Sequence, residues 1–391
     1  MQKSWDIAVV GLGAMGSAAL YQLSRHPGRV LGIDSFTPPH DKGSSHGNTR
    51  ITRQAIGEGR QYVPLAMRSR EIWRSLERES GASLYIENGL LVFAREGKSR
   101  SDHGVADFLD QTVGAAVEFG IGHELLDQAA LRRRFPQFRY NGDEVGYYEA
   151  SGGYLRPEHC IAANLGCAQR NGAELQLEQR VIAIEPGASG EGVILRCERD
   201  TIKASRVIVA AGAWMPRFLP DRVAGKLRRF RQTLHWFPLR GHPAPYAPER
   251  CPVFIRLSDA HSNMVYGFPA VNGPDGGLKV ASEQFEEDCD PDTMERTVTA
   301  AETEKIWRMA SQFLPLGTKP LKQTTCVYTV TPDFGFLIDR HPQFPQVILA
   351  SACSGHGFKH SAAIGEILAE LALGLTPQLD ISPFAYARYG G

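Results

Sequence analysis

The feature that most constrains this chain is a glycine-rich turn close to its beginning, GLGAMG at residues 11–16. An apolar run, DIAVV at residues 6–10, leads into the turn, and residues 17–26 then have helical periodicity. A second apolar run, VLGID, occupies residues 30–34. Strand, glycine turn, helix and strand in this order predict a βαβ unit of a parallel sheet.

The residue types in this unit favour a dinucleotide ligand. Gly11, Gly13 and Gly16 permit a tight turn, a close approach of pyrophosphate to backbone N–H groups, and close packing of helix on strand. The helix N-terminus favours the phosphate charge. Asp34 stands where a carboxylate can accept hydrogen bonds from ribose hydroxyls. FAD and NAD share this fingerprint, so the unit alone leaves the cofactor open.

Composition narrows the class of partner. A chain of 391 residues, of which 42% are hydrophobic and 22% charged, is long enough for two cores. Its 43 basic and 43 acidic residues cancel without long blocks of one sign, so nothing predicts a charged surface for nucleic acid or membrane. No apolar run approaches membrane-spanning length. We therefore expect two domains and a small-molecule partner.

The seven cysteines are scattered along the chain, with no CxxC pair and no metal-type spacing. This pattern argues for reduced thiols and against a disulfide scaffold or a metal site. The first residues, MQKSWDIAVVGLG, pass from charged residues directly into a strand and leave no apolar region of a signal peptide. The expectation is a cytoplasmic protein without a bound metal.

Pieces of a nucleotide-binding domain recur late in the chain. Residues 206–214 (RVIVAAGAW) and 346–359 (QVILASACSGHGFK) each have the pattern of a buried strand that runs into a turn of small residues. An amphipathic helix pattern follows and ends near Gly374. The first domain is therefore predicted to be discontinuous, with a second domain inserted into it. The predicted boundaries are 1–84, 151–219 and 321–391 for the nucleotide-binding domain, and 85–150 and 220–320 for the inserted substrate domain.

The inserted part has the pattern of an antiparallel sheet. FRQTLHWFPL, PVFIRL, NMVYGF and GLKVASEQF read as strands, and residues 292–313 read as a helix. The expected fold class is α/β for the nucleotide-binding domain combined with α+β for the substrate domain.

Seven motifs follow one another along the chain: GLGAMG, GSSHGNTRITRQAIGEGRQYVPLA from Gly43, GGYLRPEHC from Gly152, YGFP from Tyr266, GLKV from Gly277, CVYTVTPD and SGHGFK. Together they resemble the monomeric sarcosine oxidase and N-methyltryptophan oxidase family of FAD-dependent amine oxidases. The resemblance covers almost the whole chain. It implies FAD, a glutathione-reductase-like FAD-binding domain, and a second domain whose sheet covers the flavin ring.

Cys326 stands in CVYT, within a run that otherwise reads as strand, turn and strand. From the residues alone, a free cysteine there is most often a small buried hydrophobic group. The resemblance implies instead that its sulfur is joined to the 8-methyl carbon of the flavin. This attack requires a thiolate and nearby positive charge. His46 and Arg50 match the basic pair that the family places against the flavin.

The resemblance also implies a substrate site. Arg53 and Lys359 match the pair that binds the substrate carboxylate, and Lys279 matches the lysine that promotes the reaction with dioxygen. Tyr266 and Tyr328 match aromatic positions of the substrate cavity, although without the resemblance they read as core residues. The backbone of SGHGFK can stabilise negative charge on the flavin. Further cofactor contacts are expected at Ser45, Thr49, Val181, Gly212, Gly355, Gly357, Phe358 and Lys359.

Glu283 departs from the sarcosine pattern. Sarcosine-type enzymes carry histidine four residues after the oxygen-activating lysine, whereas here that position holds a carboxylate. Fructosyl amino acid oxidases are similar in having an acid there, which favours a polar or cationic substituent on the substrate nitrogen. The alternative is a salt bridge between Glu283 and Lys279 without contact to substrate.

The function expected from these residues is an FAD-dependent oxidase of N-substituted amino acids that also consumes O2 and releases H2O2. We expect it to be a monomer. Three alternatives stay open: a fructosyl amino acid oxidase or cyclic imino acid oxidase of the same family, a flavin dehydrogenase with another electron acceptor, and a flavin- or NAD-binding protein without amine chemistry.

Overall fold

The computed structural model describes residues 4–97, 105, 107–187, 192–257 and 264–389. Within these residues the strands form two eight-stranded sheets and one three-stranded sheet. None of the helices that they form is long and apolar enough to cross a membrane.

The first sheet has a parallel centre, as the glycine-rich βαβ unit predicts. β1 (Ser4–Val10) pairs in parallel with β2 (Val30–Ile33) on one side and with β12 (Thr201–Val209) on the other. Helices cover such strands on both faces, which explains why β2 is entirely buried. The parallel part continues with β9 (Glu174–Gln176) and β19 (Val347–Ser351), and antiparallel additions are β10 (Val181–Pro186), β11 (Val193–Cys197) and β18 (Leu337–Arg340).

A group of helices packs beside this sheet. α1 (Ala14–Ser24) lies against α8 (Ser361–Leu373) and α5 (Pro157–Arg170), and α2 (Val63–Ser80) packs on α8. Gly365 permits the close approach of α8, because a Cβ there would lie 2.5 Å from the Cβ of Ala18. The first and last parts of the chain therefore share one core, as the predicted discontinuous domain requires.

The second sheet is mostly antiparallel. Its strand order is β17-β13-β16-β15-β14-β5-β7-β6, and only the β14–β5 pair is parallel among the residues described. The strands are β5 (Leu90–Arg95), β6 (Glu124–Leu126), β7 (Glu144–Glu149), β13 (Arg228–Phe237), β14 (Val253–Arg256), β15 (Val265–Gly267), β16 (Leu278–Ala281) and β17 (Lys322–Val330).

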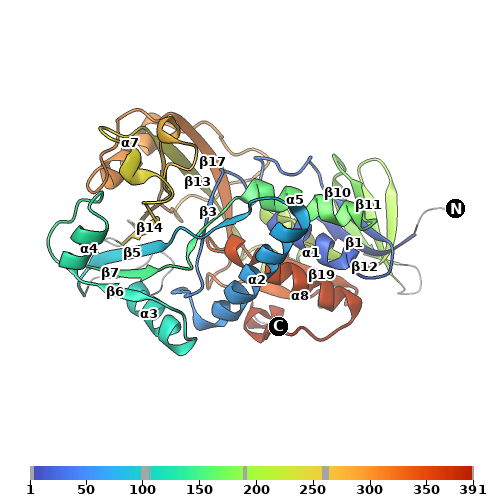
Figure 1. Ribbon diagram of the computed structural model, residues 1–391. Helices are drawn as coiled ribbons and strands as arrows, with labels where there is room; N and C mark the ends of the chain where they lie inside the picture. The colour runs from blue at the N-terminus through green and yellow to red at the C-terminus, as the bar shows by residue number, and fades with distance from the viewer. Residues whose placement is uncertain (1–3, 98–104, 106, 188–191, 258–263, 390–391) are drawn as a thin grey trace.

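The remaining elements connect or flank the sheets. The small sheet has the order β3-β8-β4, and Figure 1 shows it between the first sheet at the right and the second at the left. The further elements are β3 (Arg50–Thr52), β4 (Tyr85–Ile86), β8 (Gly153–Leu155), α3 (Phe108–Glu118), α4 (Gln128–Arg134), α6 (Asp221–Ala224), α7 (Ala300–Ala310), and the short 3-10 helices η1 (Arg60–Tyr62), η3 (Gly212–Phe218), η4 (Ala244–Tyr246), η5 (Pro274–Gly276), η6 (Phe358–His360), η7 (Ser382–Phe384) and η8 (Tyr386–Tyr389).

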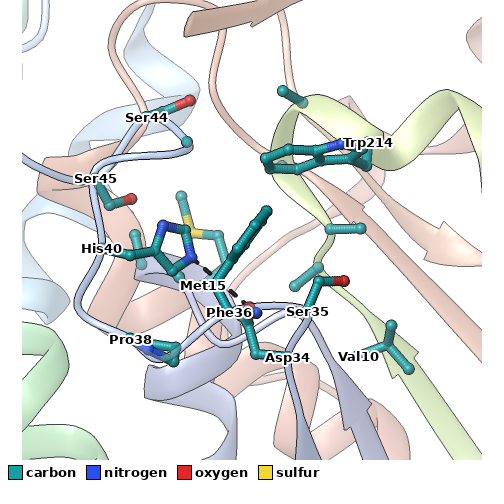
Figure 2. A pocket seen from close by; sticks show the side chains of 18 of the residues that line it. Val10, Met15, Asp34, Ser35, Phe36, Pro38, His40, Ser44, Ser45 and Trp214 are labelled. Carbon is teal, nitrogen blue, oxygen red and sulfur yellow. Dashed lines mark hydrogen bonds and ion pairs between the residues drawn. The ribbon is translucent and has the colours of Figure 1, made fainter. Parts of the chain in front are cut away.

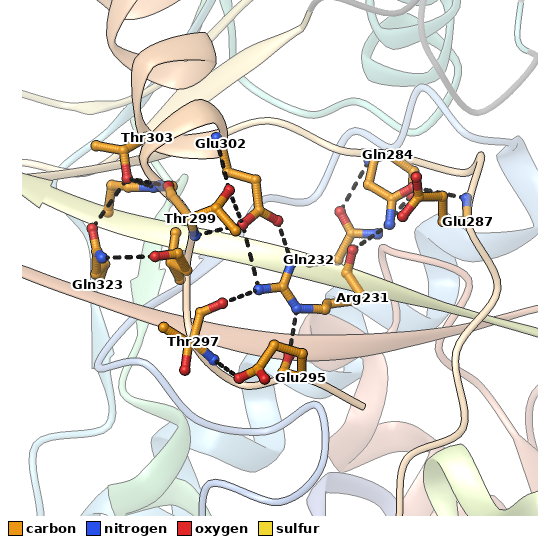
Figure 3. A network of polar contacts seen from close by, with 12 residues as sticks. Arg231, Gln232, Gln284, Glu287, Glu295, Thr297, Thr299, Glu302, Thr303 and Gln323 are labelled. Carbon is orange, nitrogen blue, oxygen red and sulfur yellow. Dashed lines mark hydrogen bonds and ion pairs between the residues drawn. The ribbon is translucent and has the colours of Figure 1, made fainter. Parts of the chain in front are cut away.

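The helix expected over residues 292–313 is shorter in the structure, where α7 spans Ala300–Ala310. The reason is a capping box, in which Thr299 and Glu302 satisfy each other's backbone N–H groups at the start of the helix. Arg231 of β13 binds Glu302 and the carbonyl groups of Glu295 and Thr297, so the segment before α7 is held against β13 and does not continue the helix (Figure 3).

β17 belongs to the second sheet, although it follows the inserted part in the sequence. The predicted boundary at residue 321 assigns it to the nucleotide-binding domain, but β17 pairs with β13 along nine residues of the second sheet. Strand partners are set by contacts far apart in sequence, which a local pattern does not report. The domain boundaries stay a prediction. The pairing brings Cys326 and Tyr328 onto one face of β17, since residues two apart in a strand point the same way.

Candidate active site

A large cavity of about 370 Å³ lies at the carboxyl ends of the parallel strands. Its walls include Val10 at the end of β1, Ile33 at the end of β2, and Ala210 just after β12. Ligands of open α/β sheets bind at this edge, where the loops after the strands diverge. The cavity is therefore the expected position for a nucleotide cofactor.

The glycine turn beside this cavity can form only because two of its positions have no Cβ. Gly11 has φ +87°, and a Cβ there would lie 2.6 Å from the carbonyl oxygen of Ala210. A Cβ on Gly16 would lie 1.7 Å from the carbonyl oxygen of Gly11, so this glycine allows α1 to pack on the turn. A Cβ on Gly13, by contrast, would come no nearer than 3.8 Å to its closest contact, Ser45 Oγ. The tightest requirement is at Gly16.

Asp34 holds the turn together and also lines the cavity. Its carboxylate accepts hydrogen bonds from the backbone N–H groups of Leu12 at 2.7 Å and Phe36 at 2.8 Å. His40 Nε2 lies 3.7 Å from the same carboxylate, as Figure 2 shows. A carboxylate fixed in this way keeps acceptor positions for ribose hydroxyl groups.

Aromatic rings form part of the same wall. Phe36 lies between His40, with ring centroids 4.9 Å apart, and Trp214, with centroids 5.6 Å apart (Figure 2). The Trp214 indole N–H donates to Asp292 at 2.6 Å, which holds its ring in place. Flat rings at the mouth of a nucleotide cavity can pack against a base. No expectation from the sequence included these residues, because they come from three separate segments.

A small cavity of about 70 Å³ adjoins the large one. Arg50, Tyr328, Gly355 and Phe358 line both cavities, so the two share a wall. A ligand that fills the large cavity up to this wall therefore presents its end to the small cavity. This is the arrangement that a cofactor and its substrate require.

Two cations and a carboxylate stand together in the small cavity. Arg53 Nη2 lies 2.5 Å from Glu58 Oε2, and Lys359 Nζ lies 3.7 Å from Glu58 Oε1. All three side chains are at least nine-tenths buried. Burial lowers the pKa of Lys359 to about 8, although Glu58 opposes this shift. Glu58 offsets one of the two positive charges, which leaves a net positive site when Lys359 is protonated.

Glu58 is a functional candidate that sequence reasoning missed. It stands within the quoted motif GSSHGNTRITRQAIGEGRQYVPLA, but nothing in the spacing assigns it a partner. Only the fold brings it to Lys359, which lies some three hundred residues further along the chain. The predicted pair of cations, Arg53 and Lys359, therefore shares one buried carboxylate, Glu58.

Lys279 of β16 is 1% exposed and reaches the segment before β3. Its ammonium donates to the carbonyl oxygens of Gly47 at 2.7 Å and Thr49 at 2.8 Å, and to Thr49 Oγ1 at 3.2 Å. Burial, followed by the charge of Arg50, lowers its pKa well below the ordinary value. These three acceptors hold the Lys279 ammonium against the segment before β3.

Cys326 and His46 are buried near the two cavities but line neither of them. Cys326 is 1% exposed, and burial raises the pKa of its thiol, whereas Arg50 and Lys279 act to lower it. Burial, and then the charge of Arg50, lowers the pKa of His46 to about 4. The neighbouring Cys353 lines the large cavity, which nothing in the sequence pattern predicted.

Tyr266, Tyr328 and Glu283 occupy the side of the small cavity that faces the second sheet. The two hydroxyl groups lie 3.4 Å apart. Burial raises the pKa of both phenols, and the charge of Glu283 adds to this effect. Glu283 is 8% exposed, so its carboxylate faces the cavity and not bulk water.

The residue after Glu283 is firmly anchored. Gln284 accepts from the Gln232 amide through its carbonyl at 2.7 Å, and its N–H donates back to Gln232 at 3.0 Å (Figure 3). Gln284 also donates to the carbonyl of Arg231. Because Gln284 is fixed against β13, its neighbour Glu283 has little freedom to leave the cavity.

The predicted site residues therefore converge, with four exceptions that lie behind the walls. Gly16, His46, Cys326 and Gly357 are those four, and Gly357 is needed for packing because a Cβ would lie 1.8 Å from the Ala352 carbonyl oxygen. The large cavity is lined by Gly11, Gly13, Asp34, Ser45, Val181 and Gly212. The small cavity is lined by Thr49, Arg53, Tyr266, Lys279, Glu283 and Lys359, and the shared wall by Arg50, Tyr328, Gly355 and Phe358.

Comparison with known proteins decides the family. Residues 6–371 match the family described as FAD dependent oxidoreductase. The chain belongs to this family. The residues around the large cavity fit FAD, since the turn at Gly11 admits a phosphate backbone and Asp34 can hold a ribose. The expected α/β and α+β fold is confirmed by the match and by the sheets.

Curated relatives match nearly the whole chain. A monomeric sarcosine oxidase of Streptomyces avermitilis is 39% identical, over 95% of this chain and 94% of the relative. An N-methyl-L-tryptophan oxidase of Salmonella heidelberg is 30% identical, over 98% of this chain and 99% of the relative. The predicted resemblance to their family is confirmed.

Solved structures show the same fold at lower identity. NikD, described as an unusual amino acid oxidase essential for nikkomycin biosynthesis, superposes with a TM-score of 0.83. It is 22% identical, and the match covers 98% of each chain.

Proposed function

We propose that the protein is an FAD-dependent oxidase of N-substituted amino acids. The observation that carries this proposal is the small cavity, where Arg53 and Lys359 lie across a shared wall from the FAD cavity. The curated relatives are named for oxidation of sarcosine and N-methyltryptophan, both N-methylated amino acids. FAD held in the large cavity would supply a hydride acceptor for the carbon next to the amine and a donor of two electrons to dioxygen.

Arg53 and Lys359 hold the substrate carboxylate. The N–H at Nε of Arg53 is a buried donor without a hydrogen-bond partner among the described residues, so it can donate to a carboxylate. Glu58 fixes the far side of the guanidinium at 2.5 Å. A charge-assisted contact of this kind contributes about 1.5–3 kcal/mol. Substrates without a carboxylate are therefore poor.

Lys279 supplies positive charge beside the shared wall. Its ammonium is fixed by Gly47 and Thr49 and lies 4.7 Å from the centroid of the Phe268 ring, another residue of the small cavity. A preorganised cation stabilises the negative charge that develops when dioxygen takes up electrons. This feature favours oxygen over another acceptor. A yield of one H2O2 per substrate under air supports the proposal, and an absence of peroxide with turnover of an artificial acceptor contradicts it.

Cys326 is proposed as the attachment point of FAD. Burial raises the pKa of its thiol, but the charges of Arg50 and Lys279 act in the other direction and favour the thiolate that must attack the flavin ring. Yellow colour should stay with the polypeptide after acid precipitation, and Cys326→Ala should release it. Complete loss of flavin from the wild-type protein in acid contradicts this attachment.

Glu283 is proposed to select the substituent on nitrogen. Its carboxylate shares the small cavity with two tyrosine hydroxyl groups, while the cations of the carboxylate site lie on Arg53 and Lys359. A second anion in this cavity favours positive charge or hydroxyl donors on the substrate. A fructosyl or other polar substituent fits this character, and a cyclic imino acid is the alternative.

We also propose that the enzyme is a cytoplasmic monomer. The described residues contain seven free cysteines, which suits a reducing compartment. The relative from Streptomyces avermitilis is named a monomeric enzyme. Light scattering after size-exclusion chromatography at micromolar concentration tests this, and a mass near twice 43.0 kDa contradicts it.

An anaerobic substrate screen tests the function as a whole. N-methyl, cyclic and fructosyl amino acids are each mixed with the yellow enzyme without oxygen, and the flavin absorbance near its visible maximum is followed. Bleaching by at least one of these secondary amines supports the proposal. Bleaching by none of them, or only by primary amino acids, contradicts it.

A further inference from the structure

The peptide group between Gly47 and Asn48 lies between two charged side chains. Its N–H, on Asn48, donates to Glu158 Oε1 at 3.1 Å, and its carbonyl oxygen, on Gly47, accepts from Lys279 Nζ at 2.7 Å. The N–H of Gly47 donates to the same glutamate oxygen at 2.7 Å. Since N–H and C=O of a trans peptide point in opposite directions, Glu158 and Lys279 stand on opposite sides of it.

This arrangement orients carbonyl dipoles toward the lysine. Three acceptors, the carbonyl oxygens of Gly47 and Thr49 and the Thr49 hydroxyl, match the three donors of an ammonium. The two carbonyl oxygens can only accept, whereas the Thr49 hydroxyl accepts the third N–H of an ammonium or would have to turn and donate to a neutral amine. A hydrogen bond at the N–H end of a peptide also polarises its carbonyl and strengthens the bond at the other end.

The backbone needs help to hold this shape. Gly47 has φ +96° and Asn48 has φ +71°, so two consecutive residues adopt the left-handed region. Asn48 is one of the few residue types that tolerate this conformation, and its cost must be offset by the surroundings. The hydrogen bonds to Glu158 act on these two residues.

We propose that Glu158 is a positioning residue for Lys279. It fixes the peptide from Gly47 to Asn48 so that its carbonyl, with that of Thr49, holds the Lys279 ammonium in place. Glu158 itself lies at the start of α5 and lines neither cavity, so it acts on Lys279 from behind the peptide, through the peptide's hydrogen bonds and through its own charge. The inference rests on the proposed role of Lys279 in the reaction with oxygen.

The charges around Lys279 agree with this role. Arg50 and Lys322 lower its pKa, whereas Cys326 and Glu158 raise it. His46, which senses both Glu158 and Lys279, is neutral at physiological pH because its pKa is about 4. Backbone N–H groups lower the pKa of Glu158 despite its burial, so the carboxylate is charged at neutral pH. Glu158 is therefore a charged carboxylate that favours the ammonium form of Lys279.

The chain offers a matched control in Glu149. This fully buried carboxylate also accepts two consecutive backbone N–H groups from the same segment, those of Gln54 at 2.8 Å and Ala55 at 3.2 Å. Gln54 and Ala55 come directly after Arg53 in the sequence, whereas the acceptors of Lys279 are on Gly47 and Thr49. Glu149→Gln thus perturbs the same segment by the same chemical change, but at the carboxylate end of the site.

The primary test is the titration of Lys279 in the flavin-loaded protein. The protein is labelled with [ε-13C]lysine, and the Lys279 signal is assigned by its loss in Lys279→Met. Glu158→Gln and Glu158→Ala should lower the titration midpoint of Lys279, because a carboxylate that favours the ammonium is gone. Glu149→Gln should leave this midpoint at the wild-type position. An unchanged midpoint in both Glu158 variants overturns the proposal, as does an equal shift in Glu149→Gln.

A kinetic test separates geometry from charge. Glu158→Gln keeps an acceptor oxygen for the two N–H groups, whereas Glu158→Ala removes it. At neutral pH, Glu158→Ala should slow flavin reoxidation by about tenfold more than flavin reduction, and Glu158→Gln should recover most of that loss. Equal slowing of both half-reactions in Glu158→Ala contradicts the proposal. If wild-type reoxidation is itself insensitive to Lys279→Met, the proposed function of Lys279 fails, while the titration still tests the positioning.

Discussion

The two cavities are built by different means. The large cavity depends on backbone: glycines without Cβ, strand ends, and a carboxylate that accepts backbone N–H groups. The small cavity depends on buried charge, since Arg53, Glu58 and Lys359 meet there with almost no solvent. A backbone site recognises what all dinucleotides share. A site of buried charges recognises one substrate class and can change its preference through single side chains.

This difference predicts different consequences of substitution. Added volume should destroy the large cavity, because backbone cannot move aside without loss of the turn. Altered charge should retune the small cavity, because each cation has a partner that becomes uncompensated when it is removed.

The largest effect is expected at Gly16. Gly16→Ala places a Cβ 1.7 Å from the Gly11 carbonyl oxygen, so α1 must shift and the phosphate turn is lost. The purified variant should contain no FAD, as measured by the ratio of its visible flavin absorbance to its protein absorbance in the ultraviolet. Gly166→Ala in α5 is the control, because Gly166 lines neither cavity and a Cβ there would meet only the end of the Arg170 side chain, at 3.7 Å. A Gly16→Ala protein with a normal FAD content would refute the backbone account.

Arg53→Met should have the next largest effect. It removes a charge-assisted contact to a substrate carboxylate, at about 1.5–3 kcal/mol of binding, and leaves Glu58 buried beside Lys359 alone. Breaking a buried ion pair costs about 3–5 kcal/mol of unfolding free energy. Urea denaturation should show that loss, and adding Glu58→Gln should restore part of the stability without restoring carboxylate binding. Recovery of both by the double variant would show that Arg53 has only a structural role.

Glu283→Gln is expected to change specificity while stability stays nearly constant. For a substrate with a hydroxyl or cationic group on its nitrogen substituent, kcat/KM should fall by more than about 1.4 kcal/mol, or tenfold. Sarcosine oxidation, if measurable, should stay nearly unchanged because its methyl group offers no partner. An equal loss on both substrates would assign Glu283 a structural role.

The smallest effect is a dependence of ligand binding on pH. Lys359 has a pKa of about 8, below its unfolded value, so the unliganded site loses positive charge as pH rises through 8. A simple carboxylate without an amine should bind about fourfold more weakly at pH 8.5 than at pH 7. Folding stability should respond in the opposite sense, gaining above pH 8 because the unfolded lysine still binds a proton. Lys359→Met should abolish both trends, as measured by flavin absorbance titration and by thermal unfolding.

The sequence predicted best what local spacing determines. The glycine turn, Asp34 and the end of α8 at Gly374 follow from residues close together in the chain. Glu58, Glu158 and the Phe36–Trp214 wall could not be predicted, because their partners lie in distant segments. The pairing of β17 with β13 likewise joins distant segments, and no local pattern reports it. Arg53 and Lys359 were found only because a family resemblance joined segments that composition and periodicity do not connect.

The central claim is that buried cations opposite FAD make the substrate carboxylate obligatory. The most direct measurement compares the rate of anaerobic flavin bleaching by an N-substituted amino acid with that by the same amine lacking its carboxylate. The decarboxylated amine should bleach the flavin at least about tenfold more slowly at equal concentration below saturation. Arg53→Met should remove most of the difference. Equal bleaching by the two compounds in the wild-type enzyme would contradict the account.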